Sequence, residues 1–154
     1  VQAVLVKNLP TIDRHAFTFC HGDFGCNQVL TERGQWSAID FDGCRYGDRY
    51  REIARLLAFL KHNVPFFLQA FRDPAQSAET LLEQASASYL RGYQEHSKEV
   101  LNWKRLFWYQ TVMEIHYLAR TLQRDLYHPV AFERTIRLIQ DLADRFKSEK
   151  GGDF

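Results

Sequence analysis

The chain has 154 residues, of which 45% are hydrophobic and 25% charged, a composition typical of a globular domain able to bury a core. Twenty basic residues against nineteen acidic ones leave a formal net charge of +1, so no strong field attracts nucleic acid or an anionic membrane. No apolar run reaches the ~20 residues of a membrane-spanning helix, and no signal peptide is visible. We therefore expect one domain over residues 1–154 that binds neither nucleic acid nor membrane, with its oligomeric state left open.

The segment before residue 48 is expected to form short strands. Its apolar, β-prone runs are Phe17–Phe19, Gln28–Thr31 and Trp36–Phe41. The last two are joined by Glu32-Arg33-Gly34-Gln35, which suits a hairpin turn. Val1–Pro10, ahead of these runs, is short and largely apolar and reads as the end of a helix.

From Asp48 onward the apolar residues recur every three or four positions, as they do on a helix. The expected helices run from about Asp48 to His62, from the N-cap Ser77 to about His96, from about Asn102 to Arg124 and from Pro129 to about Phe146. His116 lies on the apolar stripe of the third helix, and we expect it to be a hydrogen-bonded core residue. A small hairpin element followed by a helical bundle gives an α+β, mostly helical fold.

The hairpin brings polar side chains together near its open end. If the turn lies at the middle of its linker, residues whose numbers sum to about 67 face each other. Gln28 then faces Ile39, and Asn27 faces Asp40, across roughly 5 Å. The loop that carries Asp23 lies beside this mouth, so three oxygen-bearing groups converge there.

This set of side chains suits a particular chemistry. Carboxylate and amide oxygens are ligands for a hard cation, and Mg²⁺ keeps waters and phosphate oxygens in its other positions. An unpaired carboxylate nearby can orient a hydroxyl and accept its proton. A metal site beside one such acceptor is what phosphoryl transfer requires of a protein. Spacing alone also allows the acids to be ordinary solvated loop residues.

Two linked motifs carry a family resemblance: HGDFGCNQVL at 21–30 and IDFDGCRYGDRYREIARLL at 39–57. Together they resemble the catalytic core of the aminoglycoside phosphotransferase family, which has a protein-kinase-like fold. The resemblance is strong from about Phe17 to Leu60 and looser beyond. It implies the C-terminal lobe of that fold, with a catalytic loop and metal-binding hairpin at 17–48 and a substrate-side helical bundle at 48–147.

The resemblance also implies roles for single residues. Asp23 would be the catalytic acid that accepts or orients the substrate hydroxyl, and Asp40 would be the metal-binding acid. His21 and Asp48 would brace the catalytic loop. The implied cofactors are Mg²⁺ and ATP, and the implied reaction moves the γ-phosphate of ATP to the hydroxyl of a small molecule. The substrate-binding residues are not predicted.

The metal-binding amide departs from the family pattern. The family usually has Asn five positions after the catalytic Asp, where this chain has Gln28, with Asn27 one position earlier. Gln keeps the carbonyl oxygen on a longer arm, so we take Gln28 as the ligand and Asn27 as the second choice. Asp42 could contact a second metal ion or cap the following turn, and Glu52 stands where the family usually has Asp.

A second departure concerns the nucleotide. Kinases of this family carry an N-terminal lobe with a glycine-rich phosphate loop and a lysine that contacts ATP. Val1–Pro10 supplies no such loop, and Lys7 lies in no strand-rich or glycine-rich context. We therefore expect the N-terminal nucleotide lobe to be absent from this chain, and the chain alone to be inactive.

Other interpretations stay open. The lobe could be a non-catalytic remnant or an interaction module. A metal-dependent phosphoesterase also uses Gly-Asp loops, but it needs more histidine ligands than the helical half offers. Zinc binding by His15, His21, Cys20 and Cys26 fits no common tetrahedral spacing. The three cysteines form no Cys-x-x-Cys pair, which favours free thiols and a cytoplasmic location.

Overall fold

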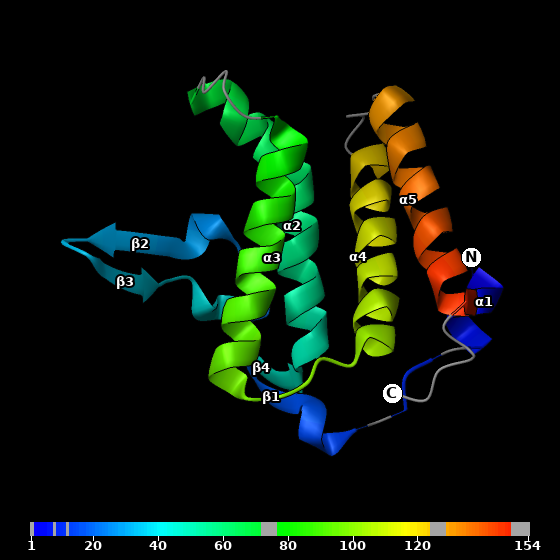
Figure 1. Ribbon diagram of the computed structural model, residues 1–154, viewed down its shortest axis with the longest axis horizontal. Coiled ribbons are helices and arrows are strands. Elements are labelled where there is room, and N and C mark those ends of the chain that lie inside the picture. The colour runs from blue at the N-terminus through cyan, green and yellow to red at the C-terminus, as the bar shows by residue number, and fades with distance from the viewer. Residues whose placement is uncertain (1, 8, 12, 72–76, 124–128, 149–154) are drawn as a thin grey trace.

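The computed structural model describes residues 2–7, 9–11, 13–71, 77–123 and 129–148 (Figure 1). Its α-helices are α1 (Gln2–Lys7), α2 (Arg49–Phe71), α3 (Ala78–Ser97), α4 (Trp103–Gln123) and α5 (Pro129–Ser148). Its strands are β1 (Phe17–Cys20), β2 (Val29–Glu32), β3 (Gln35–Ala38) and β4 (Arg45–Asp48). Short 3₁₀ turns, η1 (Arg14–Ala16), η2 (Cys26–Gln28) and η3 (Phe41–Gly43), join them. The α+β, mostly helical class that the sequence predicts is confirmed.

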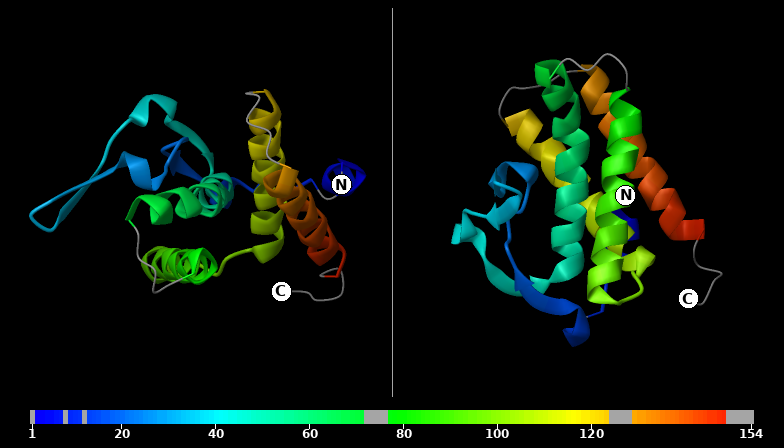
Figure 2. Two further views of the ribbon diagram at one scale, coloured as in Figure 1. Left: turned by 90° about the horizontal axis from the view of Figure 1, so that it is seen from above. Right: turned by 60° about the vertical axis from the view of Figure 1, so that its left-hand side comes forward.

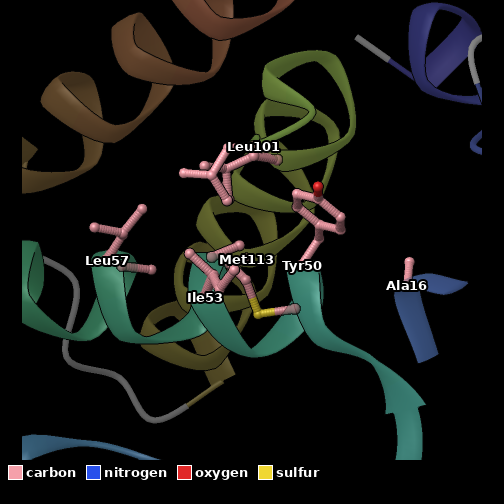
Figure 3. Close-up of a cluster of buried hydrophobic side chains, with 9 residues drawn as sticks. Ala16, Tyr50, Ile53, Leu57, Leu101 and Met113 are labelled. Carbon is pink, nitrogen blue, oxygen red and sulfur yellow. The ribbon is translucent and has the colours of Figure 1, made fainter. Parts of the chain in front are cut away.

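The helical bundle carries the hydrophobic core. α2 packs against both α3 and α4, and α5 packs against α4 (Figure 1). Tyr50, Ile53 and Leu57 share one face of α2 because they are spaced three and four residues apart, and they gather with Leu101 and Met113 (Figure 3). Each such buried side chain contributes about 1.5–3 kcal/mol to folding. Among the described residues, no helix combines the length and apolarity needed to cross a bilayer.

Two antiparallel pairs of strands lie beside the bundle. β2 and β3 form a hairpin in which Val29 lies opposite Ala38, and this is the register that the sequence predicts. The turn residues Arg33 and Gly34 have φ of 50° and 79°, and a two-residue hairpin turn of this kind needs positive φ at both positions. This hairpin projects away from the helices (Figure 2).

β4 is a strand that the sequence analysis does not predict. It pairs with β1 so that Phe17 lies opposite Asp48, and Cys20 lies opposite Arg45. Its sequence, Arg-Tyr-Gly-Asp, lacks the alternation of apolar and polar residues that marks a strand. The pairing therefore comes from tertiary context, and it delivers the chain to the start of α2.

The helix boundaries also differ in places. α2 continues to Phe71 rather than ending near His62, and it passes through Pro65, a residue that usually ends or kinks a helix. Ser77 caps α3 as predicted, its side chain accepting from the backbone N–H of Thr80 at 3.1 Å. The predicted helix end at Arg124 lies outside the described residues.

His116 is exposed, so its predicted burial is wrong. The buried face of α4 instead includes Leu106, Met113 and Glu114. His116 lies off this face, because the helices that pack on α4 cover a narrower strip than the apolar pattern suggests.

Candidate active site

The loop after β1 is held from α2. Glu52 lies in the first turn of α2, and its carboxylate accepts from the backbone N–H of His21 at 3.0 Å and of Gly22 at 2.7 Å. Both carboxylate oxygens are used, one for each N–H. Hydrogen bonds to a charged acceptor are stronger than neutral ones, so this pair fixes the backbone just before Asp23.

Within the described residues, the hydrogen bonds of Asp48 run to α2 and α4 and not to the loop that the sequence analysis expects it to brace. It is buried, and its carboxylate accepts from the guanidinium of Arg105 and from the hydroxyl of Tyr109 at 3.0 Å. It also accepts from the backbone N–H of Tyr50 at 3.0 Å. Burial, together with the charge of Asp48, raises the pKa of Tyr109 to about 12. Asp48 therefore fastens the start of α2 to α4, and Glu52, one turn further along, braces the loop instead.

His21 links the loop that carries Asp23 to the segment that carries Asp40. Its ring is buried, and Nε2 lies 2.8 Å from the carbonyl oxygen of Ile39, the residue before Asp40. The ring also lies against Phe41, with centroids 4.6 Å apart, and against Phe24 at 5.6 Å. This position is consistent with the expected bracing role of His21.

The loop that carries Gly22 and the turn that carries Gly43 approach each other backbone to backbone, with no side chain between them. Gly22 has φ of 88°, and a Cβ added there would overlap the carbonyl oxygen of Gly43. Only glycine fits such a position without strain. Asp40 is exposed and adopts the left-handed conformation, with φ of 66°, which Asp tolerates better than most residues. An outlier of this kind is typical of functional segments. Asp42 follows within η3 and is exposed.

Gln28 and Asn27 present carbonyl oxygens to the same place. A Cβ added at Gly25 would lie 2.7 Å from Oδ1 of Asn27 and 3.1 Å from Oε1 of Gln28. Gln28 is buried, and its Oε1 has no hydrogen-bond partner among the described residues. A buried carbonyl oxygen without a donor is costly, and a bound cation would satisfy it. The donors present therefore fit a hard cation.

A zinc site or a histidine-rich metal site is less well supported by the described residues than a site for a hard cation. Within the described ranges, no group of three or more His, Cys, Asp or Glu side chains is placed to hold a metal ion. The thiol of Cys20 instead lies 3.4 Å from the carbonyl oxygen of Gly47, and the cysteines are free. Neither a tetrahedral zinc centre nor the histidine cluster of a phosphoesterase is therefore built from this part of the chain.

A cavity of about 310 Å³ opens beside the loop that carries Asp23. It is lined by residues of the loop, α2 and α4: Asp23, Asn27, Gln28, Arg55, Phe59, Asn63, Tyr117, Arg120 and Thr121. The carboxylate of Asp23 is half exposed and forms an ion pair with the guanidinium of Arg55, so it is not the unpaired carboxylate that the sequence analysis expects. The cavity therefore joins the candidate catalytic acid and the two amides in one space.

Comparison with known proteins identifies the family. The model of the phosphotransferase enzyme family (APH) matches residues 1–97, more than half of the chain. The chain belongs to this family. The resemblance seen in the two motifs is thereby confirmed, and the match extends beyond them on both sides. A search of curated proteins finds no match.

The fold of this phosphotransferase-family chain also matches a solved structure. That structure is described as amicoumacin kinase hAmiN in complex with AMP-PNP, Ca²⁺ and Ami. The TM-score is 0.54 at 14% sequence identity, and the match covers 97% of this chain but 45% of the kinase. The chain thus has a kinase-like fold and spans less than half the length of that protein.

Several residues at the site of this family member were missed by the sequence analysis. Arg55, Tyr117 and Arg120 line the cavity, and Arg105 holds Asp48. Only Arg55 carried a usable signal, since it follows Glu52 by three positions and so shares a face of α2 with it. The residues from α4 come from far along the chain, and their approach depends on how the helices pack.

Proposed function

We propose that this chain carries the catalytic and metal-binding part of a small-molecule kinase, which moves the γ-phosphate of ATP to a hydroxyl group. The observation that carries the proposal is the shared cavity of Asp23, Asn27 and Gln28. His21 adds to it by tying the same loop to the segment of Asp40. The family match supports the reaction type. The similar kinase was solved with an ATP analogue and Ca²⁺, which is consistent with nucleotide and divalent-metal use.

In this proposal each residue has a separate task. Asp23 accepts the hydrogen bond of the acceptor hydroxyl and takes its proton as the new O–P bond forms and the bond from the γ-phosphorus to the leaving ADP breaks. Arg55 orients the Asp23 carboxylate through their ion pair. Asp40 and Gln28 hold Mg²⁺, with Asn27 as the second choice for the amide and Asp42 as a further candidate. The metal ion, when bound, neutralises charge on the donor phosphates.

The surface around the site supports a further part of the proposal. Six large apolar side chains between residues 19 and 46 are exposed: Phe19, Leu30, Trp36, Ile39, Phe41 and Tyr46. A kinase-like protein needs a nucleotide-binding lobe, and this apolar surface suits its docking. Positioning supplies up to roughly 7–11 kcal/mol of barrier reduction. We therefore propose that the 154 residues alone bind ATP weakly and transfer no phosphate.

The catalytic acid is tested by Asp23→Asn in a protein that joins this chain to a nucleotide-binding lobe. The change keeps the shape of the side chain and removes the proton acceptor, so kcat should fall by roughly 10²–10⁴ with nucleotide affinity little changed. Asp141→Asn, at an exposed position on α5, is the control and should keep full activity. Turnover of the Asp23 variant within a few-fold of the parent would exclude Asp23 as the acid.

The metal ligands are tested by calorimetric titration of Mg-ATP into the same protein. Asp40→Ala should weaken binding most, and Gln28→Leu should weaken it less, because a neutral carbonyl is a weaker ligand than a carboxylate. Asn27→Leu is the competing variant, because Asn27 is the second choice for the amide ligand, and Asp141→Asn serves again as the control. If the Asn27 change is damaging and the Gln28 change is silent, Asn27 is the amide ligand.

A further inference from the structure

We propose that the acceptor carries an anionic group beside its hydroxyl, and that Arg120 binds this group. The inference rests on the proposed function, because it names the acceptor class for the cavity that Asp23 lines. The volume of this cavity, about 310 Å³, is at the small end of the range for ligand sites. A cavity of that size suits a compact hydroxy acid or phosphate ester.

The balance of charge in the cavity carries the inference. Among its lining residues only Asp23, Arg55 and Arg120 are charged. Asp23 and Arg55 form an ion pair, so their charges offset each other. Arg120 is exposed on α4 and has no carboxylate partner in the described part of the chain. The cavity therefore presents one uncompensated guanidinium to its ligand.

Tyr117 lines the same cavity as the two arginines and is close enough to both to feel their charge. Its ring stacks on that of His62, with centroids 4.5 Å apart and an interplanar angle of 13°. Nε2 of His62 in turn lies 2.7 Å from the buried carboxylate of Glu114. Burial raises the pKa of Tyr117, while the positive charges of Arg55 and Arg120 oppose the rise. The phenol thus stays neutral and can donate a hydrogen bond next to the free guanidinium.

The side chains of Arg120, Tyr117 and Asn63 suit an anionic ligand better than a cationic one. A guanidinium beside a hydroxyl donor suits a carboxylate or a phosphate. Asn63 donates its amide N–H to the carbonyl of Phe59 at 2.8 Å, which leaves its own carbonyl oxygen for a ligand hydroxyl. A polyamine would meet Arg120 and find no unpaired carboxylate among the lining residues. The cavity therefore favours a hydroxylated anion over a hydroxylated cation.

Binding to the 154-residue chain tests this without any phosphate transfer. The probes are gluconate, sorbitol and glucamine, which share a polyol chain and carry a negative, neutral and positive end. In calorimetry or NMR titration we expect gluconate to bind at least about tenfold more tightly than sorbitol, with glucamine weakest. Sorbitol 6-phosphate distinguishes a preference for phosphate from a preference for carboxylate. Tighter binding of either anion than of neutral sorbitol supports the inference.

Arg120→Gln assigns the preference to one side chain. We expect it to raise the Kd for gluconate about tenfold and leave the Kd for sorbitol unchanged. Arg137→Gln, an exposed arginine on α5, is the control and should change neither. Because Arg120 is exposed, the variant should fold, and circular dichroism checks this.

Three results would overturn the inference. The first is a Kd for glucamine as low as that for gluconate. The second is a Kd for gluconate that Arg120→Gln does not change. The third is an Arg120→Gln variant that binds pyrophosphate more weakly than the parent chain but binds gluconate equally well. The last would assign Arg120 to the donor phosphates. Failure of the proposed function would look different. In that case the protein that joins this chain to a nucleotide-binding lobe would show no ATP-dependent turnover, although the chain would still bind gluconate more tightly than sorbitol.

Discussion

The segment that carries the candidate site, residues 17–48, and the helical bundle that follows are stabilised in different ways. In the bundle, Ile53 and Leu106 are almost wholly buried among other apolar side chains. In the site segment every residue of β3 is exposed, and Trp36 keeps 75% of its surface accessible. The segment is held to the bundle by a few polar contacts, above all those of Glu52 and Asp48. Stability and activity should therefore respond to different mutations.

The largest effect on folding is expected from the buried ion pair that joins the two regions. Arg105→Ala leaves the Asp48 carboxylate buried with its charge uncompensated, so the free energy of unfolding should fall by about 3–5 kcal/mol. Chemical denaturation followed by circular dichroism measures the change. Arg137→Ala, which breaks the exposed pair with Glu133, is the control and should cost no more than about 0.5 kcal/mol. Equal effects of the two variants would show that Asp48 does not anchor the segment.

An intermediate effect is expected at Glu52. Glu52→Gln keeps one oxygen but turns an amide group toward a backbone N–H, so the loop should lose about 1–3 kcal/mol of local stability. Hydrogen exchange at the amides of His21 and Gly22 should become faster, while core amides of α2 and α4 keep their protection. Glu83→Gln, on the exposed side of α3, is the matched control. Uniform acceleration over the whole chain would mean that loop and bundle unfold as one unit.

The smallest effect is expected at the hairpin. Trp36→Ser removes a large apolar side chain that contacts little, so the free energy of unfolding should change by less than about 0.5 kcal/mol. Denaturant titration at two protein concentrations measures this and also detects self-association through Trp36. A loss several times larger at high concentration would show that another copy covers the hairpin.

The sequence predicted the parts of the site that lie close together along the chain. The hairpin register follows from the turn at Arg33 and Gly34, and the closeness of Asn27 and Gln28 to the Asp23 loop follows from local spacing. These features depend on backbone geometry over a few residues, so one sequence is enough to find them.

Contacts between distant elements could not be predicted in the same way. Asp48 and Arg105 are 57 positions apart, and their pairing depends on which faces of α2 and α4 meet. The apolar pattern of α4 favoured His116 as the buried residue, whereas packing buries Glu114 beside His62. Periodicity locates a helix, but the partner helix decides which part of its face is covered.

The close approach of Gly22 to Gly43 has a consequence for descendants of this chain. Any side chain at position 22 must push the two loops apart, while the core of the bundle lies elsewhere and would still fold. Under the proposed function, a lineage no longer selected for phosphate transfer would be free to change Gly22 early while keeping Asp23 and the fold of the bundle. We expect the residue at position 22, more than the presence of Asp23, to distinguish active homologues from inactive ones.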